Sequence, residues 1–444
     1  MRKETFTISA ALFAALFFVP DTAAAHGRLP EVTRISFGPD GTVLARASFG
    51  LLVSKDGGAQ WDLICGAALG IGINEDPIYS ASPEGSLFAT TAGGLAVSRD
   101  GACTWQSAPA SGGIPFVDVT ADGRVALSSR YLKTEGTTSE YETFLWRSGA
   151  KTGAPLDPTF VPNSFAVSGT RIDIAGIRYG ENGERTALVA TSRDDGVSWV
   201  EAPVTLEADE ERIAAIASDG ERVFLRTLPK KDGASRLLLS TAEGMRTVYR
   251  APFGLTGVAF NPDLTEVWVA GGRAGIEHAS TKDFVFTRTA SIEARCLAFD
   301  ARGLWACAED RIAGFEIGLS TDGGRTFEPR MRICGVRGNA SCAEGCTGEW
   351  ERERKEIGCE ETVTPNASVT PSTGVSASDR EADTRDSESP DAGCTIATDR
   401  PASSILAPVL GVLLGLLAKV RRVRSRNGGA ELGDHQARRG PAVR

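Results

Sequence analysis

A short segment that occurs four times constrains the fold of this chain more than any other feature. Each copy begins with Ser, has Asp at its third position and Gly one or two residues later, and ends on an aromatic residue: SKDGGAQW (54–61), SRDGACTW (98–105), SRDDGVSW (192–199) and STDGGRTF (320–327). An Asp that accepts hydrogen bonds from its own loop, next to a glycine with φ > 0, is typical of a tight turn. Apolar residues flank each copy. We therefore predict that each copy joins two short β-strands and buries its aromatic ring between neighbouring sheets.

The spacing of the copies predicts a ring of seven sheets. Asp56 and Asp100 are 44 residues apart, which fits one four-stranded antiparallel sheet. The intervals from Asp100 to Asp194 and from Asp194 to Asp322, 94 and 128 residues, fit two and three such units, so three further units carry degenerate copies. One sheet cannot bury both of its faces, and closing a ring supplies the core. We expect an all-β, seven-bladed β-propeller over residues 26–333; six or eight blades also fit the spacing.

The repeated segment resembles the Asp box, or BNR repeat, of sialidase-type β-propellers. The resemblance implies a structural motif at the outer rim, between the third and fourth strands of a blade, rather than a ligand site. The residues that match the motif are Asp56, Trp61, Asp100, Trp105, Asp194, Trp199, Asp322 and Phe327.

Sialidase chemistry does not transfer to this chain residue by residue. The family resemblance implies three arginines that bind a substrate carboxylate, the first in an Arg-Ile-Pro motif, and a tyrosine nucleophile late in the chain. Arg28-Leu29-Pro30 lies near the expected place of the first arginine, but all five tyrosines precede the sixth predicted blade. His278 is the only histidine in the body of the predicted ring, since His26 and His435 lie at the ends of the chain, and no nucleophile, phosphate-binding or zinc motif occurs. We predict no catalytic residue, no metal and no cofactor.

Three long polar connections single out one region of the ring. The connections between the second and third strands of blades three, four and five cover residues 130–141, 178–185 and 229–236, whereas those of blades one and two are tight. Loops on a rigid scaffold are common places for recognition. The aromatic and basic side chains suited there to a peptide or an anionic glycan are Tyr131, Tyr141, Arg178, Tyr179, Lys230 and Arg236. Exposed hairpin tips without a ligand are the alternative.

The nine cysteines and the N-terminus favour an exported protein. Residues 1–25 read as a signal peptide with a basic start, an apolar core and a small-residue cleavage site. Cys296 and Cys307 face each other if Ala301 and Arg302 centre a hairpin turn, which places their sulfurs within bridging reach. The cluster Cys334, Cys342, Cys346 and Cys359 predicts two more disulfides, with a zinc site as the alternative. Cys65 and Cys103 would pair by exclusion, and Cys394 is left over.

The C-terminal quarter departs from the repeat. We expect a Cys-rich clamp with a short helix packed on the ring by Trp350 and Ile357 (334–360), a disordered acidic Ser/Thr/Pro stalk (361–400), a transmembrane or sorting helix (401–420) and a basic cytoplasmic tail (421–444). The order of Cys394, apolar run and arginine cluster resembles the myxobacterial type of surface-sorting tail. That resemblance implies processing and surface retention at Cys394.

The chain has a net charge of −9, which argues against nucleic-acid binding. These features predict an exported propeller, anchored at the cell surface, that acts as a non-catalytic binding or adhesion module for a glycan or protein ligand. A surface glycoside hydrolase of the sialidase-like kind, or a structural envelope or assembly scaffold, are the alternatives.

Overall fold

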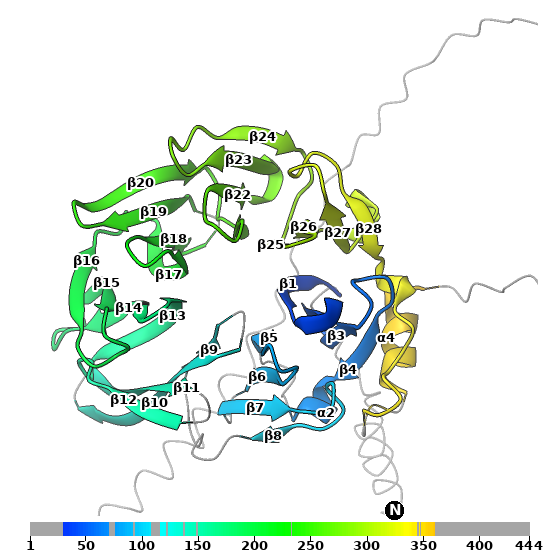
Figure 1. The fold of residues 1–444 in the computed structure, drawn as a ribbon, viewed down its shortest axis with the longest axis horizontal. Coiled ribbons are helices and arrows are strands. Elements are labelled where there is room, and N and C mark those ends of the chain that lie inside the picture. The colour runs from blue at the N-terminus through cyan, green and yellow to red at the C-terminus, as the bar shows by residue number, and fades with distance from the viewer. Residues whose placement is uncertain are drawn as a thin grey trace, which may run out of the picture. The chain divides into compact units, whose positions relative to one another are not determined.

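Seven four-stranded antiparallel sheets form a ring around a common axis (Figure 1). The computed structural model describes residues 30–70, 76–91, 94–107, 116–120, 123–135, 138–147, 150–231, 233–343, 346 and 348–359. All of them belong to one structural unit. The prediction of seven antiparallel blades is confirmed.

Each blade runs from an inner strand to an outer strand in chain order. Blades one and two consist of β1 (Val32–Phe37), β2 (Val43–Ala47), β3 (Gly50–Ser54), β4 (Asp62–Cys65), β5 (Tyr79–Ala81), β6 (Leu87–Thr91), β7 (Gly94–Ser98) and β8 (Gln106–Ser107). Blades three and four consist of β9 (Phe116–Val119), β10 (Val125–Glu135), β11 (Thr138–Arg147), β12 (Ala150–Ala154), β13 (Phe160–Ser168), β14 (Arg171–Tyr179), β15 (Arg185–Ser192) and β16 (Val200–Val204).

The later blades follow the same order. Blades five and six consist of β17 (Glu210–Ser218), β18 (Val223–Pro229), β19 (Ser235–Thr241), β20 (Gly244–Ala251), β21 (Gly257–Phe260), β22 (Glu266–Ala270), β23 (Ile276–Ser280) and β24 (Thr287–Ala290). Blade seven consists of β25 (Cys296–Asp300), β26 (Gly303–Cys307), β27 (Ile317–Ser320) and β28 (Glu328–Met331). Short helical segments are η1 (Pro39–Gly41), α2 (Gly66–Leu69), η2 (Gly272–Ala274), α3 (Asp310–Ala313), η3 (Ile333–Gly335) and α4 (Glu349–Ile357).

The hydrophobic core is divided among the junctions between blades. The described residues form seven buried apolar clusters, and each cluster joins one blade to the next, including blade seven to blade one. Between blades three and four, for example, Leu127 and Leu145 pack with Phe160 and Ile172, all nearly inaccessible to solvent. Each sheet thus shields the flank of its neighbour, which is why a single repeat cannot be stable alone.

Blade one consists only of strands from the start of the chain and blade seven only of strands from its end, so the two blades share no strand. They are joined at their junction by side-chain packing and side-chain hydrogen bonds. Trp305 of β26 is fully buried at this junction and lies against the loop at Gly58 of blade one. The backbone N–H of Val32, at the start of β1, donates a 2.7 Å hydrogen bond to the carboxyl of Glu316 in blade seven. Burial raises the pKa of Glu316 to about 7, against the opposing effects of this hydrogen bond and the charge of Arg295.

The segment after blade seven runs along the outer strand of blade one. Leu63 of β4 exchanges backbone hydrogen bonds with Gly338 and Ala340 in a parallel bridge. Beyond it, α4 buries Trp350 in the cluster between blades seven and one, and Ile357 packs against the same cluster. The predicted docking of this helix by Trp350 and Ile357 is confirmed.

Four disulfides are formed by the described cysteines. Cys296 and Cys307 face each other across the β25–β26 hairpin and are bonded, as the register predicts. Within the Cys-rich segment Cys334 is bonded to Cys359. The second bridge expected inside that segment is wrong, since its other two cysteines bond to the ring instead, in the pairs Cys65–Cys346 and Cys103–Cys342. The pairing of Cys65 with Cys103 is wrong for the same reason. These two cysteines lie in different blades, and each is bonded to a cysteine of the clamp that crosses the outside of both blades.

The expected fold class needs one correction. No helix in the described part of the chain is long and apolar enough to cross a membrane. The expectation of a transmembrane helix rested on an uncharged run that includes Pro408, Gly411 and Gly415, residues of low helix propensity, and this run lies outside the described residues. The signal peptide, the stalk, the basic tail and Cys394 also lie outside them and stay predictions.

Candidate functional site

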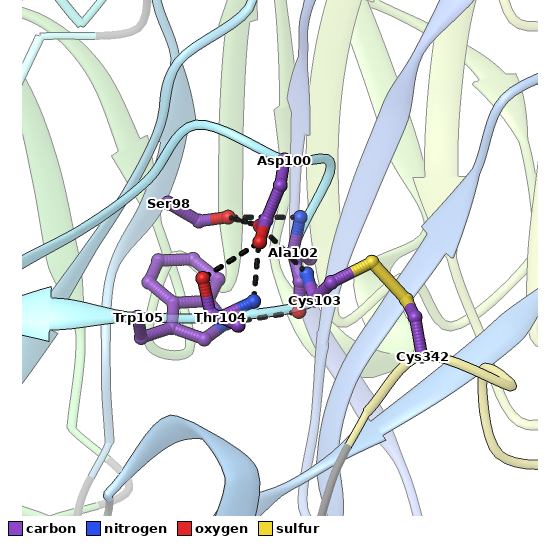
Figure 2. Close-up of a disulfide and its surroundings, with 7 residues drawn as sticks. All are labelled: Ser98, Asp100, Ala102, Cys103, Thr104, Trp105 and Cys342. Carbon is purple, nitrogen blue, oxygen red and sulfur yellow. Dashed lines mark hydrogen bonds between the residues drawn. A yellow bond between two sulfur atoms is a disulfide. The ribbon is translucent and has the colours of Figure 1, made fainter.

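The four repeated segments fold into nearly identical loops between the third and fourth strands of their blades. In blade two the Asp100 carboxylate accepts hydrogen bonds from the Ser98 hydroxyl (2.8 Å) and from the backbone N–H and hydroxyl of Thr104 (2.9 and 2.6 Å) (Figure 2). The Ser98 oxygen accepts the backbone N–H of Ala102, whose carbonyl accepts the indole N–H of Trp105. The side chains of Ser98, Asp100 and Trp105 thus all find hydrogen-bond partners within the same eight residues.

The bonds of the Ser hydroxyl and of the backbone N–H recur in blades one, four and seven around Asp56, Asp194 and Asp322. The second hydroxyl bond recurs in blades four and seven only, because blade one has Gln60 in place of the Thr or Ser. Hydrogen bonds, above all from Thr104 and Ser198, lower the pKa of Asp100 and of Asp194 to about 2. The indoles of Trp61 and Trp199 donate to the carbonyls of Gly58 and Gly196, as in blade two. Phe327 packs on the cluster between blades six and seven. The carboxylates of these loops therefore have their hydrogen-bonding capacity taken up by the loops themselves.

Figure 2 also shows that the loop of blade two is cross-linked. Cys103 lies inside the repeated segment and is bonded to Cys342 of the clamp. The loop therefore fastens the C-terminal segment to the ring as well as turning the chain between β7 and β8.

The three connections predicted to carry the ligand site are hairpins in consecutive blades, β10–β11, β14–β15 and β18–β19 (Figure 1). The first is a projecting two-stranded arm rather than a loop, because β10 and β11 extend through most of residues 130–141. Tyr131 and Tyr141 are cross-strand partners whose ring centroids lie 5.9 Å apart in an edge-to-face arrangement. Tyr131 remains 45% exposed.

The charged members of this predicted site are engaged within the protein. Arg236 is buried and forms a two-pronged ion pair with Glu210, at 2.7 and 2.5 Å, and its Nη2 also donates to the Thr205 carbonyl. Arg178 pairs with Glu201 and lies 3.6 Å from Asp157.

The remaining two members also contact their own hairpins or the neighbouring turn. The Lys230 ammonium donates to the Ala208 carbonyl at 2.7 Å. The Arg185 guanidinium lies over the ring of Tyr179, 5.8 Å from its centroid. The structure thus places the six residues on three neighbouring hairpins. Their part in ligand binding stays a prediction.

A large cavity occupies the centre of the ring. Its volume is about 1920 Å³, and inner-strand residues from around the ring line it, among them Ile35, Val119, Phe165, Ala215 and Val258. The charged side chains that line it are Arg34, Arg46, Arg99, Arg124, Arg147, Arg226, Asp76, Glu84 and Asp118. Six arginines thus face three carboxylates in a chain whose net charge is −9.

The residues of this cavity were missed by the sequence reasoning, although one of them left a signal. Arg226 is the single charged residue in the otherwise uncharged strand β18. Charged residues in apolar strands are rarely placed there without a partner or a function. Asp118, in the short strand β9, is buried, and its burial raises the pKa of its carboxyl.

One group of metal-ligating residue types lies close together in the described part of the chain: Cys65, Cys346 and Glu349. The two cysteines form a disulfide, so their sulfurs are not thiolates that could bind a cation.

Comparisons with known proteins extend the likeness no further than the fold. No family profile matches the sequence, and a search of curated proteins finds no similar one. A puromycin-hydrolyzing peptidase of Mycobacterium tuberculosis shares 12% identity at a TM-score of 0.47 over 69% of this chain and 54% of the peptidase, so the chain spans about half of that protein. An oligogalacturonate lyase shares 12% identity (TM-score 0.45; 63% and 86% of the two chains), and a GH74 enzyme of Niastella koreensis shares 12% (TM-score 0.31; 66% and 56%). We draw no functional argument from similarities this low.

Proposed function

We propose that this protein is an exported, non-catalytic binding module of the Asp-box β-propeller class that captures an acidic glycan. The observation that carries the proposal is the charge of the central cavity, where six arginines face three carboxylates although the whole chain is acidic. An excess of one sign of charge in a cleft focuses the field there and raises the local concentration of ligands of the opposite sign. The net charge of the whole chain is negative and would repel an anion. The positive charge that could attract one is therefore confined to the cavity.

The three hairpins of blades three to five supply the second part of the proposed surface. Tyrosines with an exposed ring offer large contact area at a low cost in conformational entropy, and Tyr131 stands on the longest of these hairpins. Arg178, Lys230 and Arg236 are paired inside the protein and act here by holding the hairpins in place.

Export is supported by the disulfides. Four bridges, two of them linking residues more than 200 positions apart, are typical of proteins that function in an oxidising compartment. The proposed ligand is therefore one that an extracellular or envelope protein meets.

A glycan array probed with the full-length chain tests the proposal. We expect binding to glycans that carry carboxylate or sulfate groups and little binding to their neutral counterparts. A Tyr131→Ala/Tyr179→Ala variant should weaken this binding by roughly tenfold or more, the loss of one or two good contacts. Val197→Ala is the matched control, because Val197 is 75% exposed but lies in the β15–β16 connection, at the opposite end of blade four from Tyr179.

Binding to acidic glycans that is lost in the tyrosine variant and kept in the control supports the proposal. If the protein binds no glycan on the array, the proposal is refuted and a structural role is favoured. Release of a shortened product from any bound glycan also refutes it, because the protein would then be an enzyme.

A further inference from the structure

We propose that Arg34 and Arg226 together bind one oxyanion group of the ligand, a carboxylate or sulfate, inside the central cavity. This inference rests on the proposed function and names the chemical group that the cavity recognises. It depends on an internal comparison between the arginines of the ring, which differ sharply in how far the protein satisfies them.

Arg226 is held at the edge of the cavity with part of its hydrogen-bonding capacity unused. Its strand is paired on both sides, with Ala214 in β17 and Leu237 in β19, so its position is fixed. One terminal nitrogen donates to the Leu255 carbonyl at 3.2 Å. Its Nε–H is buried and has no acceptor among the described residues. A buried donor left unpaired costs free energy unless another molecule supplies the acceptor.

Other buried arginines of the same ring show that this fold can saturate a guanidinium. Arg171 donates to both carboxylate oxygens of Asp173, at 2.7 and 2.9 Å, and also to backbone carbonyls. Arg236 has Glu210 and the Thr205 carbonyl. Among the described residues no carboxylate lies within 4.0 Å of Arg226. Arg147, Arg178 and Arg330 also have a buried Nε–H without an acceptor, but each of them pairs with a carboxylate: Asp195, Glu201 and Glu328, respectively. Arg226 has an open donor and no such carboxylate partner, which points to an acceptor from outside the chain.

Arg34 supplies the second positive charge. It is exposed to the cavity on the inner strand β1 and has no hydrogen bond or ion pair among the described residues. Its cross-strand neighbour Arg46 lines the same cavity but is engaged, donating to Thr33 at 2.8 Å and to the Asp76 carbonyl at 3.3 Å. The two arginines of one strand pair thus divide into one that is satisfied and one that is open.

Arg34 and Arg226 also repel each other. Burial, and then the charge of Arg34, lower the pKa of Arg226 to about 10, which leaves it positive at neutral pH. Asp118 lies close enough to interact with Arg34, but burial raises the pKa of its carboxyl and two backbone N–H groups already use it as an acceptor. An oxyanion between the two guanidiniums would remove the repulsion and supply the missing acceptor. Guanidinium forks match the planar carboxylate and the oxygens of sulfate particularly well.

Calorimetric titration of the full-length chain with D-glucuronate, glucose 6-sulfate and glucose, at constant ionic strength, tests the inference. We expect the two acidic sugars to bind and glucose to bind at least tenfold more weakly, the loss of a charge-assisted contact. Arg34→Gln and Arg226→Gln should each reduce the affinity for the acidic sugars by at least tenfold. Arg226→Lys should recover only part of it, because an ammonium keeps the charge and loses the fork.

Arg193→Gln is the matched control, since Arg193 is exposed and holds the second position of the repeat loop in blade four but does not line the cavity. It removes the same charge from the protein and should change the affinity less than twofold. An equal loss in Arg193→Gln overturns the inference in favour of a diffuse field. Tighter binding of the tripeptide Ala-Ala-Ala than of glucuronate overturns the assignment to a sugar acid.

Unchanged affinity in folded Arg34→Gln and Arg226→Gln proteins overturns the inference while leaving the proposed function intact, if the array still shows tyrosine-dependent binding. Absence of binding by either acidic sugar, together with a silent array, refutes both. Melting temperatures and circular dichroism of every variant establish that the fold is kept, so a loss of affinity is assigned to the site.

Discussion

The two disulfides that fasten the clamp to the ring should stabilise the protein in a non-additive way. Cys65–Cys346 and Cys103–Cys342 link blades one and two to the same short stretch of chain. They span 281 and 239 residues, so each closes nearly the same loop. We consider the replacement of either pair by alanines, and then of both.

The magnitude follows from the loop that each bridge closes when the other is present. In the chain-entropy description, a bridge that closes 239 residues stabilises the folded state by about 5.5 kcal/mol at 25 °C. With the other bridge intact, the path between the two cysteines shortens to the difference between the separations, 42 residues, and the stabilisation to about 4 kcal/mol. Removing one bridge should therefore cost about 4 kcal/mol, and removing both about 9.5 kcal/mol.

The assay is equilibrium unfolding of the full-length chain in guanidinium chloride, under oxidising conditions, for the wild type, each double-alanine variant and the four-alanine variant. The coupling between the two removals should be about 1.5 kcal/mol, with the four-alanine variant less stable than simple addition predicts. Additive losses, or a smaller loss in the four-alanine variant, would refute the reasoning, because they would show that the bridges do not share one loop. Replacing Cys296 and Cys307, which close only an 11-residue hairpin, serves as the control.

Two further predictions concern the closure of the ring. Gly58→Ala should destabilise the protein by about 1–3 kcal/mol more than Gly323→Ala: both glycines have positive φ, but a Cβ at Gly58 would lie 2.9 Å from the buried Trp305 ring, whereas nothing lies within 4 Å of one at Gly323. Equal losses in thermal unfolding would show that only backbone strain matters. The pKa of Glu316 is raised from 4.5 to about 7 in the folded protein, so the folded state binds a proton on this carboxyl more tightly than the unfolded state does. The contribution of Glu316 to the free energy of unfolding should therefore fall by about 3 kcal/mol as the pH rises from about 4.5 to 7, and then level off. Urea unfolding at pH 5 and pH 8 should show this decrease in the wild type and not in Glu316→Gln; the same slope in both would exclude Glu316 as its source.

The fold was predictable because its signals are local. The repeat at 44-residue spacing reflects a turn whose Ser, Asp and aromatic residue bond within eight positions, and Asp100 and its equivalents show those bonds. The Cys296–Cys307 bridge was predictable for the same reason, since a hairpin register is fixed by its turn. Cys342 and Cys346 were assigned wrongly, because their partners depend on where the clamp crosses the ring.

The candidate site was less accessible to sequence reasoning. Arg236 looked like a surface residue at a polar hairpin tip, but it is buried against Glu210, a partner 26 residues away in the chain. Arg34 and Arg226 gave no joint pattern, because the closure of the ring, and not their spacing, brings them to one cavity.

Alternation, turn chemistry and repeat length predict a ring of about seven antiparallel sheets and the loops that turn their strands, because these signals act over a few residues. Which side chains face the same cavity, and which cysteines meet across more than 200 residues, depends on the packing of the whole ring. Those encounters depend on how seven twisted sheets pack flank to flank until the last meets the first, and no local pattern encodes where that closure places a given arginine or sulfur.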